Sequence, residues 1–540
     1  QIKSEIAKKL EYDMDSNRQY LDELIQENLF SKFKSFDGEE KIHFTYEKIR
    51  DYYVARSVVK KHNENLDDLK DLIKNDLVAN GEYGVMEVLF FMLPNSYDID
   101  VIDLISQKDF PALKRTFIES VPWRTQTLKS ESIQNVLDDI FHNDNMMSSF
   151  LEKQFLLAVD EESPFNAEWL TENLLVMDND LRDYIWTTRI SGQYNSFSLQ
   201  FINRIKRNYK ILSLNQLRLA LKQLLWLLSS VNGKVRDSAT KTISLIFIEK
   251  PELISDFLES FIEVTDLYIL ERLYAAIFGA IVKIIDTEII ESTAKVVYEA
   301  VFNQEEVVPH VLLRDYARLI IEFALSKKLC LFVDSKLIVP PYNSSWYDFK
   351  FTNEDVDNFV KTYDSASRYE QNSVDRIKYS MITEYGRGTG GYGDFGRYTF
   401  GSRVSSWKNQ FNDQDLSNIA FKRIFELGFS PKLHATFDNT QARSYDRHDH
   451  KIERIGKKYQ WIAMYEVLAK LSDNFTVYKE VEVYDDIYQE YEKQSSEKLI
   501  QELLSLDKGD LDFDVDTIDE VEMNPEEHLI EVKRKNEHYF

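Results

Sequence analysis

The residues of this sequence that could do chemistry lie in two segments, and the first is rich in glycine. Seven of the 16 glycines lie between Gly386 and Gly401, and glycine-rich loops can cradle phosphate groups. A Walker A loop needs Gly-Lys-Ser or Gly-Lys-Thr at the start of a helix, and neither tripeptide occurs in the chain. A dinucleotide-binding loop needs a preceding strand within a βαβ unit, which the surrounding sequence does not predict. We therefore do not expect this segment to bind a nucleotide.

Aromatic and basic side chains are interspersed in the same segment, which favours contact with a protein. Tyr and Arg are enriched among the side chains that contribute most to binding. The candidate contact residues are Arg387, Tyr392, Phe395, Arg397, Tyr398 and Arg403. Two interpretations stay open: a flexible loop that contacts a partner, and an ordered surface loop that packs on the rest of the protein.

The second segment, residues 443–461, is locally basic, with six Lys or Arg against three acidic residues. One interpretation is contact with a partner or with phosphate, in which Arg454 would take part. The candidate partner-contacting residues are Arg443, Arg447, Lys457 and Lys458. The alternative is a helix face that packs in a core, because apolar residues recur at helical spacing. Those apolar residues are Ile452, Ile455, Tyr459, Ile462 and Ala463.

Metal binding and nucleophilic catalysis find little support in the residue pattern. His448 and His450, with Asp446 and Asp449, are weak metal-ligand candidates. Histidines two positions apart do not share a helix face, and no distant third ligand is evident, so we predict no metal site. Cys330 lies in the apolar run Leu-Cys-Leu-Phe-Val, where a thiol is normally inert. No Gly-x-Ser-x-Gly motif occurs, so we predict no catalytic residue and no enzyme activity in this chain.

The composition predicts helices around a sizeable core. Of the 540 residues 43% are hydrophobic, and Gly (16) and Pro (10) are scarce, which favours helix over a β-sandwich or barrel. A net charge of −26 argues against nucleic acid as a partner of the bulk surface, because phosphate affinity rests on Lys and Arg. A single cysteine fits a reducing cytoplasm.

No segment predicts a membrane span or a secretion signal. The longest apolar stretch, Ile269 to Ile285, contains Glu271, Arg272 and Lys283, so it predicts a buried helix. The chain begins with Gln1 and without an apolar leader. We therefore expect Gln1 to be an internal position of a longer protein.

Four regions are expected along the chain. Residues 1–60 look like the end of a winged-helix unit: two short amphipathic helices, a turn at Asp37-Gly38, a strand at 41–45 and a helix at 46–60. Residues 61–340 are predicted to be helical. Residues 341–450 are predicted to be irregular, because Pro340-Pro341 ends the helical run and glycine is concentrated there. Residues 451–540 are predicted to be helical, with an acidic segment from Asp510 to Glu527.

Three segments within the helical region resemble one another. Arg236, Arg272 and Arg314 are each followed by Ala three positions on and then by an apolar helix. Their spacing of 36 and 42 positions matches a helix pair per repeat, as in HEAT arrays. The small Ala would let two helices approach closely, and stacked pairs would bury a shared core. We therefore predict an all-α fold: a HEAT/TPR-like α-solenoid preceded by a winged-helix remnant and carrying an irregular glycine-rich insertion.

Several segments resemble the bacterial antiviral STAND NTPases of the Avs family. Phe44 to Ala55 looks like the closing helix of their NTPase module. Further likenesses are Phe117 to Arg124, Ser163 to Leu170, Asp266 to Tyr274 and Leu313 to Arg318. The most specific are Gly393-Asp-Phe-Gly-Arg-Tyr398 and Glu453-Arg-Ile-Gly-Lys-Lys-Tyr-Gln-Trp461. Together they extend from about position 40 to about 470.

The resemblance implies that this chain is the end of an NTPase module followed by a sensor. ATP and Mg²⁺ would be bound by a module that precedes Gln1, together with an effector domain, and no cofactor is expected in this chain. Family sensors bind conserved phage proteins, the large terminase subunit or the portal, and binding drives tetramer assembly. The chain departs from the family pattern in having no Walker motifs, so ATP hydrolysis is carried over to no residue here.

The leading hypothesis is thus a cytoplasmic sensor region that binds a phage protein. A HEAT-like scaffold with a constitutive cellular partner is the alternative. An enzyme fragment, with a metal site at His448 and His450 or an accessory role in nucleic-acid processing, is the third hypothesis.

Overall fold

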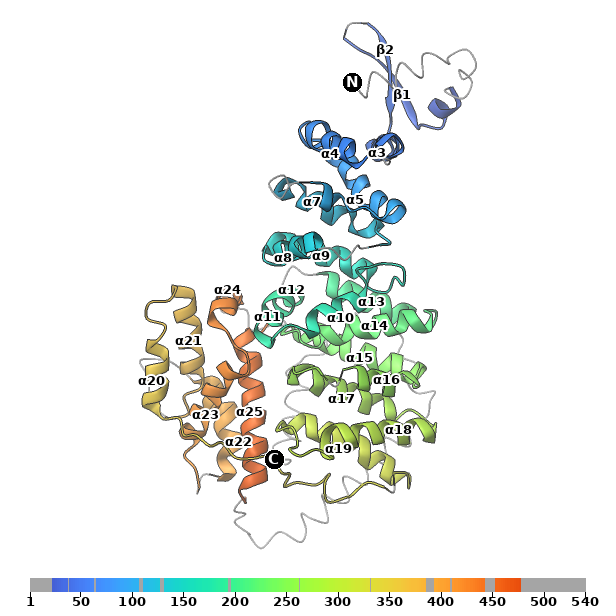
Figure 1. The fold of residues 1–540 in the computed structure, drawn as a ribbon. Helices are drawn as coiled ribbons and strands as arrows, with labels where there is room; N and C mark the ends of the chain where they lie inside the picture. Colours follow the sequence, from blue (N-terminus) through green and yellow to red (C-terminus); the bar gives the residue numbers. More distant parts are fainter. Residues whose placement is uncertain are drawn as a thin grey trace, which may run out of the picture. The chain divides into compact units, whose positions relative to one another are not determined.

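The computed structural model describes residues 22–476, except 37, 63–64, 106–109, 127–130, 193–195, 262, 331, 385–392, 408–409 and 442–451. Most of these residues are helical (Figure 1), which confirms the prediction of a mainly α-helical chain. In this described part, no helix has both the length and the apolarity needed to cross a bilayer.

The described chain begins with a helical turn at residues 22–26, and a β-hairpin follows it. Strands β1 (Phe30–Lys34) and β2 (Glu40–Phe44) pair antiparallel, and Gly38 between them has a φ of +86°, which glycine adopts readily. Helix α3 (Glu47–His62) follows. The strand predicted at 41–45 and the helix predicted at 46–60 are confirmed. Strand β1 corrects the prediction of helix directly before the turn. Phe30 pairs with Phe44 on the opposite strand, and their rings lie 4.5 Å apart, a cross-strand contact that stabilises a hairpin.

The helices after α3 follow one another along the molecule in the order of the sequence. They are α4 (Leu66–Leu72), the π-helix η1 (Ile73–Val78), α5 (Tyr83–Tyr97), α6 (Val101–Leu104), α7 (Phe110–Ser120), the 3₁₀-helix η2 (Val121–Trp123), α8 (Glu131–Phe141), α9 (Asp144–Leu157), α10 (Ala167–Leu175), α11 (Asn179–Arg182), the π-helix η3 (Asp183–Thr187), α12 (Thr188–Ser191), α13 (Ser196–Asn208), α14 (Leu214–Leu227), α15 (Gly233–Glu249), α16 (Leu253–Ser260), α17 (Leu267–Ile281), α18 (Thr287–Val297), the π-helix η4 (Tyr298–Phe302) and α19 (Val311–Ser326). We call α3 to α19 the array.

Alternate helices of the array lie side by side. Helix α5 packs on α3 and α7, α15 packs on α13 and α17, and α17 packs on α19, while α16 packs on α18. One apolar core continues through the array from Val54 to Ile338. Each helix therefore buries its apolar face against its neighbours, which a single helical hairpin could not do.

The three related Arg segments lie in α15, α17 and α19, which are neighbours. Arg272 Nη1 in α17 is 3.0 Å from Asp237 Oδ1 in α15, so the repeated polar residues link adjacent helices. Ala239 and Ala317 are fully buried, as expected where two helix backbones approach. The apolar stretch around Ile277 forms the buried helix α17, as predicted.

Beyond α19, a second group of helices builds its own core. These helices are α20 (Asn353–Lys361), α21 (Arg368–Ser380), the π-helix η5 (Phe395–Gly401), α22 (Ser402–Val404), the 3₁₀-helix η6 (Ser405–Trp407), α23 (Asp413–Glu426), α24 (Pro431–Gln441) and α25 (Ile455–Asn474). We call α20 to α25 the C-terminal body. Its core includes Val231 and Tyr268 of the array, and α25 packs on α17 and α19.

The prediction of irregular structure over 341–450 is wrong for most of its described residues. Glycine is concentrated in one short stretch, and the sequence on either side has good helix starts. Thr352, Ser367 and Asn412 each accept a hydrogen bond from a backbone N–H in the first turn of the next helix, which stabilises that end. Irregular structure instead occupies the described residues between Ser326 and Asn353.

Candidate partner-binding surface

The described part of the glycine-rich segment is a packed helix. Residues 395–401 form the π-helix η5, in which Phe395 and Phe400 are buried, and the Phe395 ring lies 5.1 Å from the Trp461 ring. A Cβ on Gly396 would be 2.6 Å from the carbonyl oxygen of Ile382, so glycine is required there by close backbone contact and not by a bound phosphate. The flexible-loop interpretation is therefore wrong for these residues.

Two predicted contact residues of this segment remain at the surface. The Tyr398 side chain is 62% exposed, and the exposed Arg403 donates from Nη1 to the Thr399 carbonyl at 3.0 Å. Arg397 is partly buried and donates from Nη2 to the Glu384 carbonyl at 3.0 Å. Tyr398 and Arg403 can thus face a partner, whereas Arg397 is partly engaged within the protein.

Eight of the candidate residues lie outside the described residues. They are Arg387, Tyr392, Arg443, Asp446, Arg447, His448, Asp449 and His450. In the part of the chain that is described, no three His, Cys, Asp or Glu side chains are arranged to hold a metal ion.

Lys458 was predicted to contact a partner, and that prediction is wrong. Its side chain is buried, with Nζ 2.8 Å from an Asp183 carboxylate oxygen and 2.6 Å from Asp266 Oδ2. Tyr459 also donates to Asp183 at 2.8 Å. The neighbouring Lys457 is half-exposed and lies 3.5 Å from Glu453, so it stays available to a partner.

Within this buried cluster, the opposite charges stabilise the ionised form of each side chain. Burial alone would lower the pKa of Lys458, but Asp183 and Asp266 raise it above its usual value. Burial alone would raise the pKa of Asp183, but Lys458 holds it below its usual value. Because Asp183 lies in η3, Asp266 caps α17 and Lys458 lies in α25, this cluster fastens the C-terminal body to the array.

A second ionic cluster fastens the other end of α25. Arg314 in α19 donates from Nη1 to Asp473 at 2.8 Å and from Nη2 to the Val307 carbonyl at 2.7 Å. The other Asp473 oxygen accepts from the backbone N–H of Tyr342 at 2.9 Å. Both ends of α25 are therefore held to the array by charged side chains that are largely buried.

Between these clusters, His310 and Glu271 face each other without a hydrogen bond. His310 Nδ1 accepts from the Leu313 N–H at the start of α19, which leaves the proton on Nε2, 3.8 Å from Glu271 Oε2. Burial lowers the pKa of His310 to about 3 and raises the pKa of Glu271. His310 is consequently neutral near pH 7.

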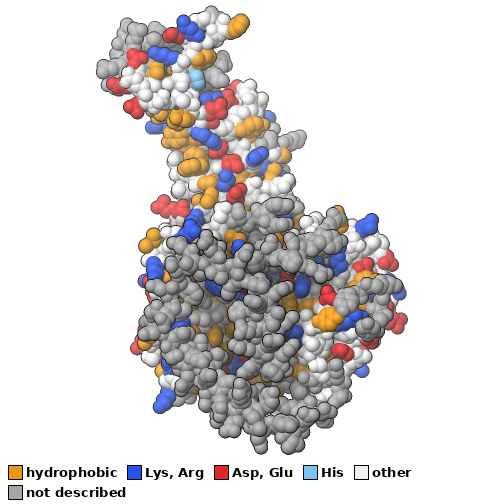
Figure 2. All heavy atoms as spheres, turned by 180° about the vertical axis from the view of Figure 1, so that it is seen from behind, with side chains coloured by type: hydrophobic (Ala, Val, Ile, Leu, Met, Phe, Trp, Pro, Cys, Tyr) orange, Lys and Arg blue, Asp and Glu red, His pale blue; other side chains and the backbone are white. Residues whose placement is uncertain are grey.

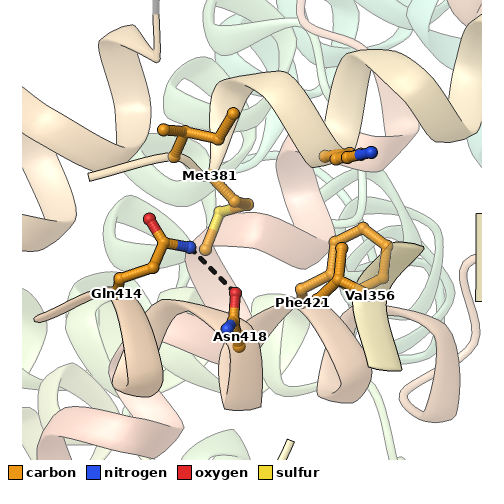
Figure 3. A pocket seen from close by; sticks show the side chains of 7 residues that line it. Val356, Met381, Gln414, Asn418 and Phe421 are labelled. Carbon is orange, nitrogen blue, oxygen red and sulfur yellow. Dashed lines mark hydrogen bonds between the residues drawn. The ribbon is translucent and has the colours of Figure 1, made fainter. Parts of the chain in front are cut away.

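A small hollow in the C-terminal body has no free polar group for a ligand (Figure 3). It is lined by Val356, Lys378, Met381, Ile382, Gln414, Asn418 and Phe421. Gln414 donates to Asn418 and accepts from the N–H of Thr383, while Lys378 is paired with Asp357 at 2.8 Å. With its amides and its cation already engaged, this hollow does not form a substrate site.

Cys330 fits the prediction of an inert thiol. It is buried, and burial raises its pKa to about 11. A thiol that stays protonated at neutral pH is a poor nucleophile.

No protein-family model, no curated protein and no solved structure matches the chain. Inferences about what this surface binds therefore rest on its exposed side chains.

Exposed aromatic side chains also occur on the hairpin and the start of α3. They are Phe33, Phe36, Tyr46, Tyr52 and Tyr53. Hydrophobic side chains are visible on this part of the surface, at the top of Figure 2. Neither strand of the hairpin contains a buried residue. A two-stranded sheet is only marginally stable by itself, so a hairpin that buries no side chain is unusual.

Proposed function

We propose that this chain is a protein-recognition region and, on its resemblance to the antiviral STAND NTPases, a sensor for a phage protein. The array would be a HEAT-like α-solenoid that presents the flanks of successive helices to a large partner. The large terminase subunit and the portal are the partners that the resemblance implies. ATP binding, Mg²⁺ binding and tetramer assembly would belong to the longer protein.

The observation that carries this proposal is the continuous core of the array. Helices α3 to α19 share one core and leave long flanks of polar and apolar side chains at the surface. Arrays of this kind bind macromolecules along an extended surface and not in a deep pocket. The small, fully engaged hollow between α20, α21 and α23 is consistent with that mode of binding.

The C-terminal body limits where a partner could bind. Because α25 packs on α17 and α19, this part of the array is already covered by the chain itself. A partner would contact the remaining helices of the array, the exposed side of the C-terminal body around Tyr398, or both.

The test is a binding assay of this chain against purified phage proteins, including large terminase subunits and portals. Saturable binding to one of them, in the nanomolar to micromolar range of specific interfaces, is expected. An unrelated phage protein of similar charge serves as the control. If no terminase or portal binds, the sensor proposal is refuted and a scaffold with a cellular partner becomes the better account.

A further inference from the structure

One part of the array carries the opposite charge from the rest of the chain. Residues 197–250 contain ten Lys or Arg and two acidic residues, a net charge of +8 in a chain with a net charge of −26. The ten are Arg204, Lys206, Arg207, Lys210, Arg218, Lys222, Lys234, Arg236, Lys241 and Lys250. Eight of them belong to α13, α14 and α15, and Lys210 and Lys250 follow the ends of α13 and α15; the three helices lie next to one another in the array (Figure 1).

Four of these cations are engaged within the protein. Lys222 is paired with Glu168, Arg218 lies 3.7 Å from Asp256, and Arg236 stacks on the ring of Tyr268 at 4.6 Å. Arg204 donates to the Phe155 carbonyl at 2.9 Å. The others form no ion pair with the described residues: Lys206, Arg207, Lys210, Lys234, Lys241 and Lys250.

The connections bring most of the unpaired cations to one end of these helices. Loops of five residues join α13 to α14 and α14 to α15, which makes each successive pair antiparallel. The end of α13, with Lys206, Arg207 and Lys210, therefore lies beside the end of α15, with Lys250. Because α13 and α15 are in contact, these side chains form one surface, which we call the basic end.

Exposed aliphatic side chains lie within the basic end. Ile211, which follows α13, is 81% exposed, and Ile248 in the last turn of α15 is 39% exposed. Leu214 at the start of α14 is also exposed. Single-stranded nucleic acids are held by exposed aromatic rings on which their bases stack. The aromatic residue of the basic end, Tyr209, is partly buried, with Lys210 Nζ 5.9 Å from its ring centre, whereas the exposed apolar side chains there are aliphatic.

We infer that the basic end binds an acidic protein segment that also carries aliphatic side chains. Lys206, Arg207 and Lys210 would pair with its carboxylates, and Ile211 and Ile248 would contact its apolar residues. Charge complementarity of this kind selects the partner and accelerates its association. The inference rests on the proposed function, because it names the chemistry of the protein that the chain would recognise.

The test measures binding of the whole chain to a fluorescent acidic peptide composed of Glu and Leu, and to single-stranded DNA of similar length. The expected result is peptide binding that weakens with salt and that exceeds DNA binding. The triple variant Lys206→Glu, Arg207→Glu, Lys210→Glu should weaken peptide binding on the order of tenfold or more. A matched variant, Lys34→Glu, Lys60→Glu, Lys74→Glu, makes the same charge change at exposed positions elsewhere and should bind the peptide nearly as the parent does.

Equal binding of the peptide by the two triple variants, or no peptide binding at all, would overturn the inference. Tighter binding of DNA than of peptide would assign the basic end to nucleic acid instead. If the basic-end variant fails to fold, the milder variant Lys206→Gln, Arg207→Gln, Lys210→Gln repeats the test. If a phage protein binds both triple variants equally, the inference is refuted and the proposed function stands. If the peptide binds in a charge-dependent way but no phage protein binds, the inference stands and the proposed function is refuted.

Discussion

The ammonium group of Lys458 lies 2.8 Å from a carboxylate oxygen of Asp183, although 275 positions separate the two residues in the sequence. This buried pair joins the last described helix to the middle of the array. With Asp266 as a third member, this cluster anchors one end of α25 to the array, while Arg314 and Asp473 anchor the other end.

Replacement of Lys458 by Met should loosen the C-terminal body. It would leave Asp183 and Asp266 buried without their counter-charge, and the removal of one partner from a buried ion pair costs about 3–5 kcal/mol. Urea denaturation, followed by tryptophan fluorescence, measures the loss. Lys457→Met is the matched control, because the adjacent half-exposed lysine should change the free energy of unfolding by no more than about 0.5 kcal/mol. Equal losses in the two variants would contradict the structural role of Lys458.

Acid should destabilise the protein well above the pKa of its carboxylates, because His310 is buried. The unfolded chain takes up a proton at this side chain near pH 6.5, whereas burial lowers the pKa in the folded protein to about 3. Between these values the unfolded state binds more protons, so the free energy of unfolding falls as the pH is lowered, by up to about 1.4 kcal/mol per pH unit.

The variant His310→Asn isolates this contribution. Asn keeps a side chain that can cap α19 but does not titrate. Between pH 6.5 and pH 4.5, the variant should lose about 2 kcal/mol less stability than the parent in urea denaturation. His434, whose pKa is also lowered by burial, is present in both proteins and cancels in the comparison. Identical pH profiles would show that the pKa of His310 is the same in the folded and unfolded states.

How much of this architecture could be predicted depends on whether a contact is local. The helix face of Ile452, Ile455, Tyr459, Ile462 and Ala463 is buried as predicted, because helical spacing alone indicates it. The same spacing could have predicted that Lys458 is buried, because it lies three residues after Ile455 and four before Ile462, on that face. Its partners Asp183 and Asp266 are remote in sequence, so a core lysine could not be distinguished from a binding lysine. The basic stretch 197–250 was visible in the sequence, but its convergence at one end required the helix connections.

The glycine-rich segment illustrates the opposite error. The glycine content left a flexible loop and an ordered, packed loop both open, whereas at Gly396 glycine reflects contact with the backbone at Ile382. Gly396→Ala should therefore destabilise the protein by about 1–3 kcal/mol, the range for overpacking, since its Cβ would lie 2.6 Å from a carbonyl oxygen. Gly233→Ala is the control: nothing lies within 4 Å of its Cβ position, and Ala should add up to about 1 kcal/mol. Thermal denaturation of both variants measures these effects. If Gly396→Ala did not change the stability, the backbone around Gly396 would have to shift easily to accommodate the Cβ.

The small alanines of the repeated segments should matter according to their burial. Ala239→Leu introduces three carbon atoms where α15 is fully packed and should cost about 1–3 kcal/mol. Ala275 occupies the equivalent position in α17 but is only half-buried, so Ala275→Leu should cost clearly less. The two variants are compared by urea denaturation. A larger loss for Ala275→Leu would contradict close packing at Ala239 as the reason for the repeated alanine.

Partner contact by the C-terminal body can be separated from its stability by two neighbouring aromatic residues. Tyr398 is exposed and Phe395 is buried against Trp461, although both belong to η5. If the partner contacts this surface, Tyr398→Ala should weaken its binding by about 1–3 kcal/mol and leave the thermal denaturation midpoint unchanged. Phe395→Ala should instead lower the midpoint, since truncation of a buried Phe costs about 3–5 kcal/mol. Calorimetric titration with the partner, together with a melting curve for each variant, measures both effects. Unchanged affinity in Tyr398→Ala would exclude this side of the C-terminal body and direct the search for the contact surface to the array.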